Sequence, residues 1–178
     1  MNAMNAPPPQ SALRRQVCLA APALLAAGAL SGALAGCSPS QRAPYSTFTL
    51  LDGQKFYSSA FTGAVAMVNF WATWCPSCVS EVQPLIELYQ HYRPRGVQVL
   101  AVAVRSDRAE RLSRFVQDRQ IPYPVAYDRD GSIARQWGGV NATPTAFVLD
   151  RKGRIARRFV GSRLHEVSQL MDKLLAKS

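Results

Sequence analysis

The chain has 178 residues, enough for one ordinary domain with an N-terminal appendage. Lys and Arg number 21 against 11 Asp and Glu, which gives a formal net charge of +10 at pH 7. Without a recognisable nucleic-acid-binding module, this charge favours an anionic membrane or acidic partners over nucleic acid. The four cysteines include a single C-x-x-C pair, which excludes a zinc site built from two such pairs.

The segment 1–36 has the composition of an export signal. Arg14 and Arg15 precede an uncharged apolar run, Val17 to Leu34, which matches the basic and apolar regions of such a signal. The run is also long enough for a marginal membrane span, so an uncleaved anchor is the alternative. It ends in Leu34-Ala35-Gly36-Cys37, which resembles the bacterial lipobox and implies a lipid on Cys37 as the mature N-terminus. The alternative is a chance cysteine beside an ordinary cleavage site.

Residues 37–46 are polar and contain two prolines, which predicts a short tether before a domain over 47–178. Removal of residues 1–36 takes away Cys18 and two arginines, and leaves a net charge of about +8. With Cys37 lipidated, Cys75 and Cys78 are the remaining redox pair. An exported chain with one such pair indicates a compartment that permits disulfides.

Two strands and a helix are predicted in the first half of the domain. Residues 48–51 form a short strand before a turn at Asp52-Gly53, and the apolar run 65–71 is typical of a buried parallel strand. Apolar residues then recur at helical spacing from Cys78 to Tyr92. Pro84 lies inside this pattern, which predicts a kink or a break there.

The second half alternates between strand and helix patterns. Residues 97–104 predict a second buried strand, and Asp107 is the predicted N-cap of a helix with Leu112, Phe115 and Val116 on its inner face. The remaining expected elements are an extended segment at 122–127, a short helix at 131–137, an antiparallel hairpin of 145–150 and 154–160, and a closing helix at 164–175. This order predicts a single α/β domain whose mixed sheet has helices on both faces.

Cys75 and Cys78 follow the first buried strand, at the start of a predicted helix. Cysteines three residues apart close a small disulfide ring when the backbone between them turns into a helix. The first thiol then lies over the helix N-terminus, where unpaired N–H groups favour the thiolate. The pattern predicts dithiol–disulfide exchange. Val79 after the second cysteine excludes the C-x-x-C-H haem attachment motif.

The segment Asn69 to Cys78, the later segment Ala142 to Asp150 and Gly153 together resemble the thioredoxin fold. More narrowly they resemble the TlpA/ResA/CcmG group of extracytoplasmic, membrane-tethered thiol–disulfide oxidoreductases, over about residues 45–176. The resemblance implies a thioredoxin-like mixed sheet and an enzyme that uses the Cys75–Cys78 disulfide, with no other cofactor and no metal.

By this resemblance, Cys75 is the exposed nucleophile and Cys78 is the buried resolving thiol. Pro76 helps to set the redox potential and contacts the substrate. Pro144 matches the cis-proline that faces the disulfide in the family, and the backbone of Thr143 pairs with an extended substrate segment. The alternative for Pro144 is an ordinary trans proline that opens a strand.

Two tryptophans and one glutamate complete the predicted site. Trp71 and Trp74 form an apolar rim around the thiols, with core packing as the alternative for Trp71. Thioredoxins carry a buried acid where this chain has Asn69, whereas the TlpA/ResA group has a glutamate at the position of Glu81. Glu81 is therefore expected to raise the thiol pKa values or to move the proton of the resolving thiol, and a solvated helix residue is the alternative.

The resemblance also implies partners and a location. The partners are proteins with reducible disulfides and an upstream membrane electron donor. The favoured targets belong to cytochrome c maturation or a related assembly process. The protein is expected to be a monomer on the periplasmic side of a membrane, held there by its lipid, and to bind no nucleic acid.

Two other functions remain as alternatives. A peroxiredoxin-type peroxidase shares the fold, but it requires a threonine three residues before its reactive cysteine, and Ala72 stands there with Thr73 one position off. A copper-delivery module needs softer or additional ligands, whereas the chain offers two thiols and no suitably placed histidine.

Overall fold

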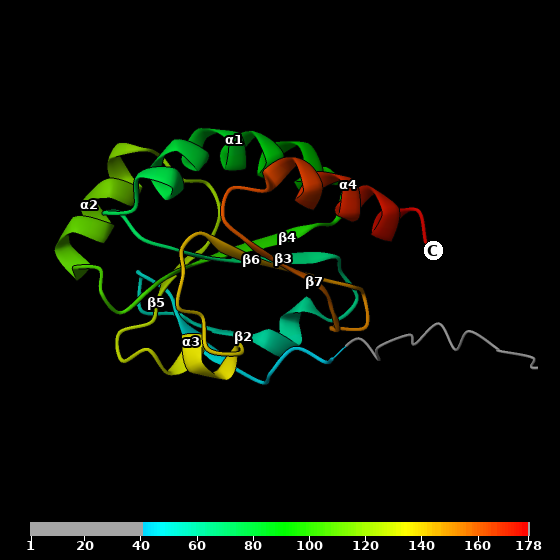
Figure 1. Ribbon diagram of the computed structural model, residues 1–178, viewed down its shortest axis with the longest axis horizontal. Coiled ribbons are helices and arrows are strands. Elements are labelled where there is room, and N and C mark those ends of the chain that lie inside the picture. Colours follow the sequence, from blue (N-terminus) through cyan, green and yellow to red (C-terminus); the bar gives the residue numbers. More distant parts are fainter. Residues whose placement is uncertain (1–40, 178) are drawn as a thin grey trace, which may run out of the picture. The chain divides into compact units, whose positions relative to one another are not determined.

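The computed structural model describes residues 41–177, and Figure 1 shows a central sheet between two layers of helices. The predicted export signal, Cys37 and the first residues of the predicted tether lie outside the described residues. The strands of the central sheet are β3 (Ala66–Trp71), β4 (Gln98–Ala103), β5 (Val125–Tyr127), β6 (Thr145–Leu149) and β7 (Ile155–Val160). A separate antiparallel pair consists of β1 (Thr47–Thr49) and β2 (Lys55–Tyr57).

The helices are α1 (Pro76–Tyr92), α2 (Ala109–Asp118), α3 (Ser132–Gln136) and α4 (Leu164–Leu175), with 3-10 turns η1 (Ser58–Phe61) and η2 (Arg93–Arg95). The sheet order is β5-β4-β3-β6-β7. Strand β3 lies in the middle, parallel to β4 and antiparallel to β6. The predicted mixed sheet is therefore confirmed.

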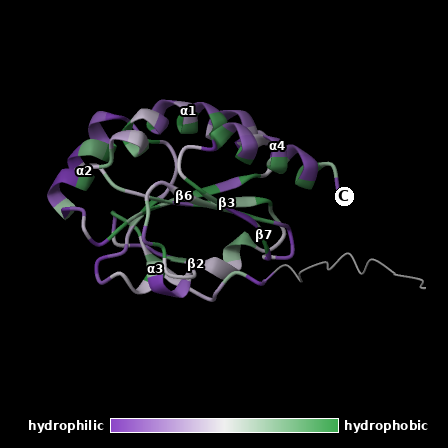
Figure 2. Cartoon of the chain, in the orientation of Figure 1, coloured by the Kyte–Doolittle hydropathy of each residue, from purple (hydrophilic) through white to green (hydrophobic). Residues whose placement is uncertain are grey.

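Alternate residues of the central strands face two separate cores, because successive side chains of a strand point to opposite faces. In β3, Met67 packs with buried residues of α1 and α4, whereas Val68 packs with Phe61 and Trp137 on the other face. Helices α1 and α4 cover one face of the sheet and α3 covers the other (Figure 1). The buried strands β3 and β6 are mostly apolar, whereas the helices carry polar residues on their outer surfaces (Figure 2). Helices therefore cover both faces, as predicted.

The segment before β1 packs on the domain, although residues 37–46 were predicted to be a tether. The backbone N–H of Ala43 donates to the carbonyl of Gly153, and the N–H of Ile155 donates to the carbonyl of Gln41. Ser46 is buried, and its hydroxyl contacts Trp137. The packed part of the chain therefore begins before the predicted boundary at residue 47.

Two local predictions differ from the structure, and one strand was not predicted. Helix α1 continues through Pro84, so the predicted break there is absent, since packing on the sheet offsets the lost hydrogen bond. Asp107 is not the N-cap of α2, because its carboxylate binds Thr73 and its own next residue, and Arg108 takes the cap position. The sequence of strand β2 has no strong apolar alternation, and its extended conformation is stabilised by hydrogen bonds to β1.

Within residues 41–177, no helix is both long enough and apolar enough to cross a membrane.

Candidate active site

The cysteine pair lies where β3 passes into α1. Cys75 is the N-cap residue of the helix, in an extended conformation, and its sulfur accepts a hydrogen bond from the backbone N–H of Cys78 at 3.2 Å. The two residues form a disulfide with their Cα atoms 5.2 Å apart. The first sulfur therefore receives an N–H donor from the first turn of α1, an arrangement that stabilises negative charge on it.

The sulfur of Cys75 is covered by a loop from the other half of the chain. It lies 3.5 Å from the carbonyl oxygen of Thr143 and 3.4 Å from the hydroxyl of Ser77. The Thr143–Pro144 peptide bond is cis, as the resemblance implied. These neighbours leave Cys75 only 4% exposed, so the prediction of an exposed nucleophile is wrong for this disulfide form. Cys78 is buried as predicted, at 3%.

A buried carboxylate holds the turn that carries the cysteines. Asp107 accepts hydrogen bonds from the backbone N–H of Thr73 at 2.6 Å, from its hydroxyl at 2.7 Å and from the N–H of Arg108 at 2.9 Å. The side chain thus ties the strand-to-helix turn after β3 to the loop after β4. Sequence reasoning missed this role, because the contact joins residues 34 positions apart and leaves no local pattern.

Glu81 lies one turn after Cys78 on α1 and is buried. Its carboxylate accepts a hydrogen bond from the hydroxyl of Ser162. Burial raises the pKa of Glu81 above its usual range, and the donors at Ser162 and the Arg163 backbone only partly oppose this shift. Glu81 also lines a small cavity together with Asn69 and Pro144. The glutamate is therefore not a solvated helix residue.

The two tryptophans of the predicted rim have different environments. Trp74 is 50% exposed beside the cysteine pair, as a rim residue should be. Trp71 is buried, and its ring centroid lies 5.6 Å from that of Phe115 on α2. Core packing therefore describes Trp71. Pro76, the first residue of α1, is exposed next to Cys75.

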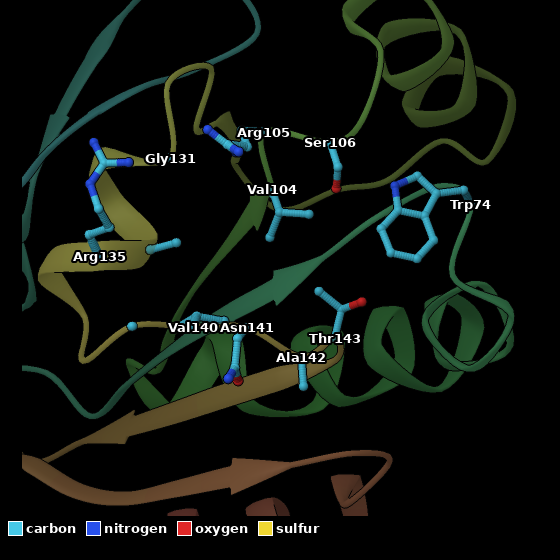
Figure 3. Close-up of a pocket in the computed structure, with 12 residues that line it drawn as sticks. Trp74, Val104, Arg105, Ser106, Gly131, Arg135, Val140, Asn141, Ala142 and Thr143 are labelled. Atoms are coloured by element: carbon cyan, nitrogen blue, oxygen red, sulfur yellow. The ribbon is translucent and has the colours of Figure 1, made fainter.

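A groove of about 680 Å³ opens beside the cysteines, lined at one side by Trp74 and Thr143 (Figure 3). Its far side carries Arg105 and Arg135. Arg105 belongs to the loop between β4 and α2. Among residues 41–177, no three His, Cys, Asp or Glu side chains lie close enough together to hold a metal ion.

Comparison with known proteins gives a consistent picture. The Redoxin family matches residues 38–174. The thiol-disulfide oxidoreductase ResA of Bacillus thuringiensis subsp. konkukian is 34% identical over 127 residues, which cover 71% of this chain and 72% of the relative. The solution structure of a putative thioredoxin from Neisseria meningitidis has a TM-score of 0.72 and 31% identity, and the match covers 78% of this chain and 93% of the other.

A thiol:disulfide interchange protein of the thioredoxin family from Chlorobium tepidum is also similar. Its crystal structure has a TM-score of 0.71 and 27% identity, and the match covers 79% of this chain and 99% of the other. Sequence and fold therefore lead to the same class of protein, one whose chemistry depends on a cysteine pair.

Proposed function

Because the chain belongs to the Redoxin family, and is a TlpA/ResA-like thiol–disulfide oxidoreductase, we propose that it reduces disulfides of specific partner proteins outside the cytoplasm. The observation that carries this proposal is the position of the Cys75–Cys78 disulfide. It lies at the N-terminus of α1, with the Thr143 carbonyl 3.5 Å from the Cys75 sulfur. That carbonyl is a backbone acceptor beside the reacting sulfur, and it suits a substrate segment bound by strand addition.

The reaction begins with the reduced pair. The Cys75 thiolate attacks one sulfur of the substrate disulfide, a new S–S bond joins Cys75 to the substrate, and the second substrate sulfur leaves as a thiolate that takes up a proton. The N–H of Cys78, which donates to the Cys75 sulfur in the disulfide form, stabilises the attacking thiolate. Trp74 and Pro76 contact the incoming chain because both are exposed beside the pair.

The second step resolves the mixed disulfide. Cys78 loses its proton and attacks the sulfur of Cys75, which releases the first substrate sulfur as a thiolate. Glu81 is the proposed acceptor of the Cys78 proton, since it lies one helical turn away and its raised pKa makes it a stronger base than an exposed glutamate. The substrate gains two electrons and the pair becomes a disulfide. An upstream membrane dithiol then restores the reduced pair.

The proposed location follows from the N-terminal sequence. The export signal would deliver the domain across the membrane, and a lipid on Cys37 would keep it there. A monomer tethered in this way meets membrane-bound partners, and the proposed targets belong to cytochrome c maturation or a related assembly process. The net positive charge suits an anionic membrane surface and implies no nucleic-acid partner.

A peroxidase function has less support. The threonine nearest the peroxidatic position is Thr73, and both its N–H and its hydroxyl are bound to Asp107. That hydroxyl is thus committed to the turn before α1, while Ala72 occupies the position three residues before Cys75.

Trapping of substrates tests the proposed function. In the native host, a Cys78→Ala variant is expected to accumulate mixed disulfides on Cys75 that a strong thiol reductant releases. A Cys75→Ala variant, which retains the other thiol, is the matched control and is expected to trap none. Equal trapping by both variants, or none by Cys78→Ala, would contradict the mechanism. Tight stoichiometric Cu(I) binding without any thiol exchange would support the copper-delivery alternative in its place.

A further inference from the structure

The groove beside the cysteine pair is lined by apolar residues and by positively charged residues. Among residues 41–177, its lining includes Val104, Ala134 and Val140 as apolar residues and Arg105 and Arg135 as the only charged ones, with no Asp or Glu. A groove of about 680 Å³ is large enough for several side chains of an extended peptide.

The two arginines come from different elements and converge on one glycine. Arg105 lies in the loop after β4, and Arg135 lies on α3. A Cβ atom placed on Gly131 would lie 2.8 Å from Cδ of Arg105 and 3.3 Å from Nη1 of Arg135. The absence of a side chain at Gly131 therefore lets both arginine side chains lie over the same point, at the far side of the groove from Trp74 (Figure 3).

Both guanidinium groups are available to a ligand. Both residues are exposed, and within residues 41–177 neither has a carboxylate within 4.0 Å. Arg135 donates one hydrogen bond to the backbone carbonyl of Asp130, while the Asp130 carboxylate accepts from the backbone N–H of Ser132. The two like charges at this side of the groove repel each other, and an anion bound between them would reduce the repulsion.

One end of the groove is lined by Trp74 and Thr143, the neighbours of the cysteine pair. Thr143 lines it and also places its carbonyl beside the Cys75 sulfur. Residues 139–143 form one wall, so a substrate that pairs with Thr143 continues along this wall toward the arginines. An extended strand advances about 3.3 Å per residue, and a groove of about 680 Å³ has room for several residues next to the target cysteine.

We propose that this groove binds the substrate segment on one side of the target cysteine, and that Arg105 and Arg135 select segments that carry Asp or Glu there. The occupant is thus an acidic extended segment of a partner protein. Guanidinium groups bind carboxylates by paired hydrogen bonds, and the apolar surface between Trp74 and the arginines holds the intervening side chains. This inference rests on the proposed function, because it concerns the substrates of the same thiol pair.

The test uses the reduced full-length chain and synthetic peptides with one cysteine, held as a mixed disulfide with 2-thiopyridine. Cys75 attacks the peptide sulfur, the bond to the pyridyl sulfur breaks, and thiopyridone leaves with a proton and is followed by its absorbance. Cys78 then releases the peptide thiol and the pair is oxidised. One series carries Asp and Glu on the N-terminal side of the cysteine, a second carries them on the C-terminal side, and matched peptides carry Asn and Gln.

Each chain reacts once, and we expect the second-order rate constant of this single turnover to be about three- to tenfold higher for acidic than for amide peptides in one series only, the range for two partly exposed ion pairs. The double variant Arg105→Gln/Arg135→Gln is expected to lose this preference, and Arg105→Lys/Arg135→Lys to keep part of it. The control variant Arg111→Gln/Arg114→Gln on α2 lowers the net charge by the same amount as Arg105→Gln/Arg135→Gln. It is expected to keep the full preference for acidic peptides. The pyridyl disulfide of 2-mercaptoethanol is too small to reach the arginines, so all variants should reduce it alike.

Three results would overturn the inference while the small disulfide is still reduced. These are equal rates for acidic and amide peptides, a preference of equal size in both series, and an equal loss of preference in the α2 variant. The last two would show that long-range charge attraction acts instead of the groove. Failure to reduce the small disulfide would contradict the proposed function itself.

Discussion

The hydroxyl of Ser162 donates a hydrogen bond to the carboxylate of Glu81, which lies 81 positions earlier in the chain. The contact joins the loop before α4 to the first turns of α1, one helical turn from Cys78. Burial raises the pKa of Glu81 and the serine donor lowers it, so the loop opposes the effect of burial. The basicity of this glutamate therefore depends on a residue far from it in sequence.

Glu81→Gln should stabilise the protein at neutral pH. The pKa of Glu81 is raised in the folded state, so its contribution to stability is fully present below the usual value of 4.5 and is lost as pH rises through the folded value. The glutamine keeps an oxygen acceptor for Ser162 and does not ionise. The stability gain over wild type should be near zero below pH 4 and grow upward from pH 4.5, by about 1.4 kcal/mol for each pH unit until the folded pKa is passed.

Urea unfolding of the oxidised protein across this pH range measures that gain. Glu87→Gln is the matched control, because it removes a carboxylate from the exposed side of the same helix. A constant difference between Glu81→Gln and wild type at all pH values would contradict the assignment of a raised pKa.

Ser162→Ala should raise the pKa of Glu81 further, because the serine hydroxyl favours the ionised carboxylate. The titration of the Glu81 carboxyl carbon, followed by NMR in wild type and variant, measures the change. Ser168→Ala removes a hydroxyl that binds the carbonyl of His165, and it should leave the titration of Glu81 unaltered. A lower pKa in Ser162→Ala would refute the role given to the hydroxyl.

Asp107→Ala should destabilise the turn before the cysteine pair. The substitution removes a buried acceptor from the backbone N–H and hydroxyl of Thr73, and hydrogen bonds to charged groups contribute about 1.5 to 3 kcal/mol. We expect a loss of about 2 to 3 kcal/mol in the free energy of unfolding and slower thiol exchange. Asp118→Ala, at the exposed end of α2, is the matched control and should change both quantities little. Equal losses in the two variants would argue against a specific tie to Thr73.

Ser46→Ala should weaken the attachment of the N-terminal segment. The Ser46 hydroxyl accepts from Nε1 of Trp137 at 3.0 Å and donates to the side chain of Gln136 at 2.9 Å. Without it the buried indole N–H has no partner, at a cost of about 1 to 3 kcal/mol. Thermal unfolding measures the effect against Ser59→Ala, an exposed serine of η1. An unchanged stability would mean that another acceptor replaces the serine.

The elements near the cysteines could be predicted because their patterns are local. The apolar run that became β3 and the helical spacing that became α1 require only neighbouring residues, and the cysteine pair marks the junction between them. Asp107 shows the limit of this approach. An aspartate before a helix is an ordinary N-cap candidate, but a partner 34 residues away in sequence determines its contacts.

The charged residues show the same difference between what a local pattern predicts and what long-range contacts decide. The composition revealed an excess of arginines and gave no reason to separate Arg105 from the others. Its place in the groove depends on the parallel pairing of β3 with β4, which brings the loop after β4 next to Trp74, and on the open space at Gly131.

By itself, the sequence determined the fold class, the thiol pair and the kind of chemistry, because these depend on short-range periodicity and on two cysteines at a fixed spacing. The tertiary structure alone decided that Cys75 is buried in the disulfide form, that Trp71 belongs to the core, and that Glu81 has a raised pKa. Burial and long-range hydrogen bonds are properties of the packed chain. They arise only when segments such as the Thr143 loop and the start of α4 come together around α1.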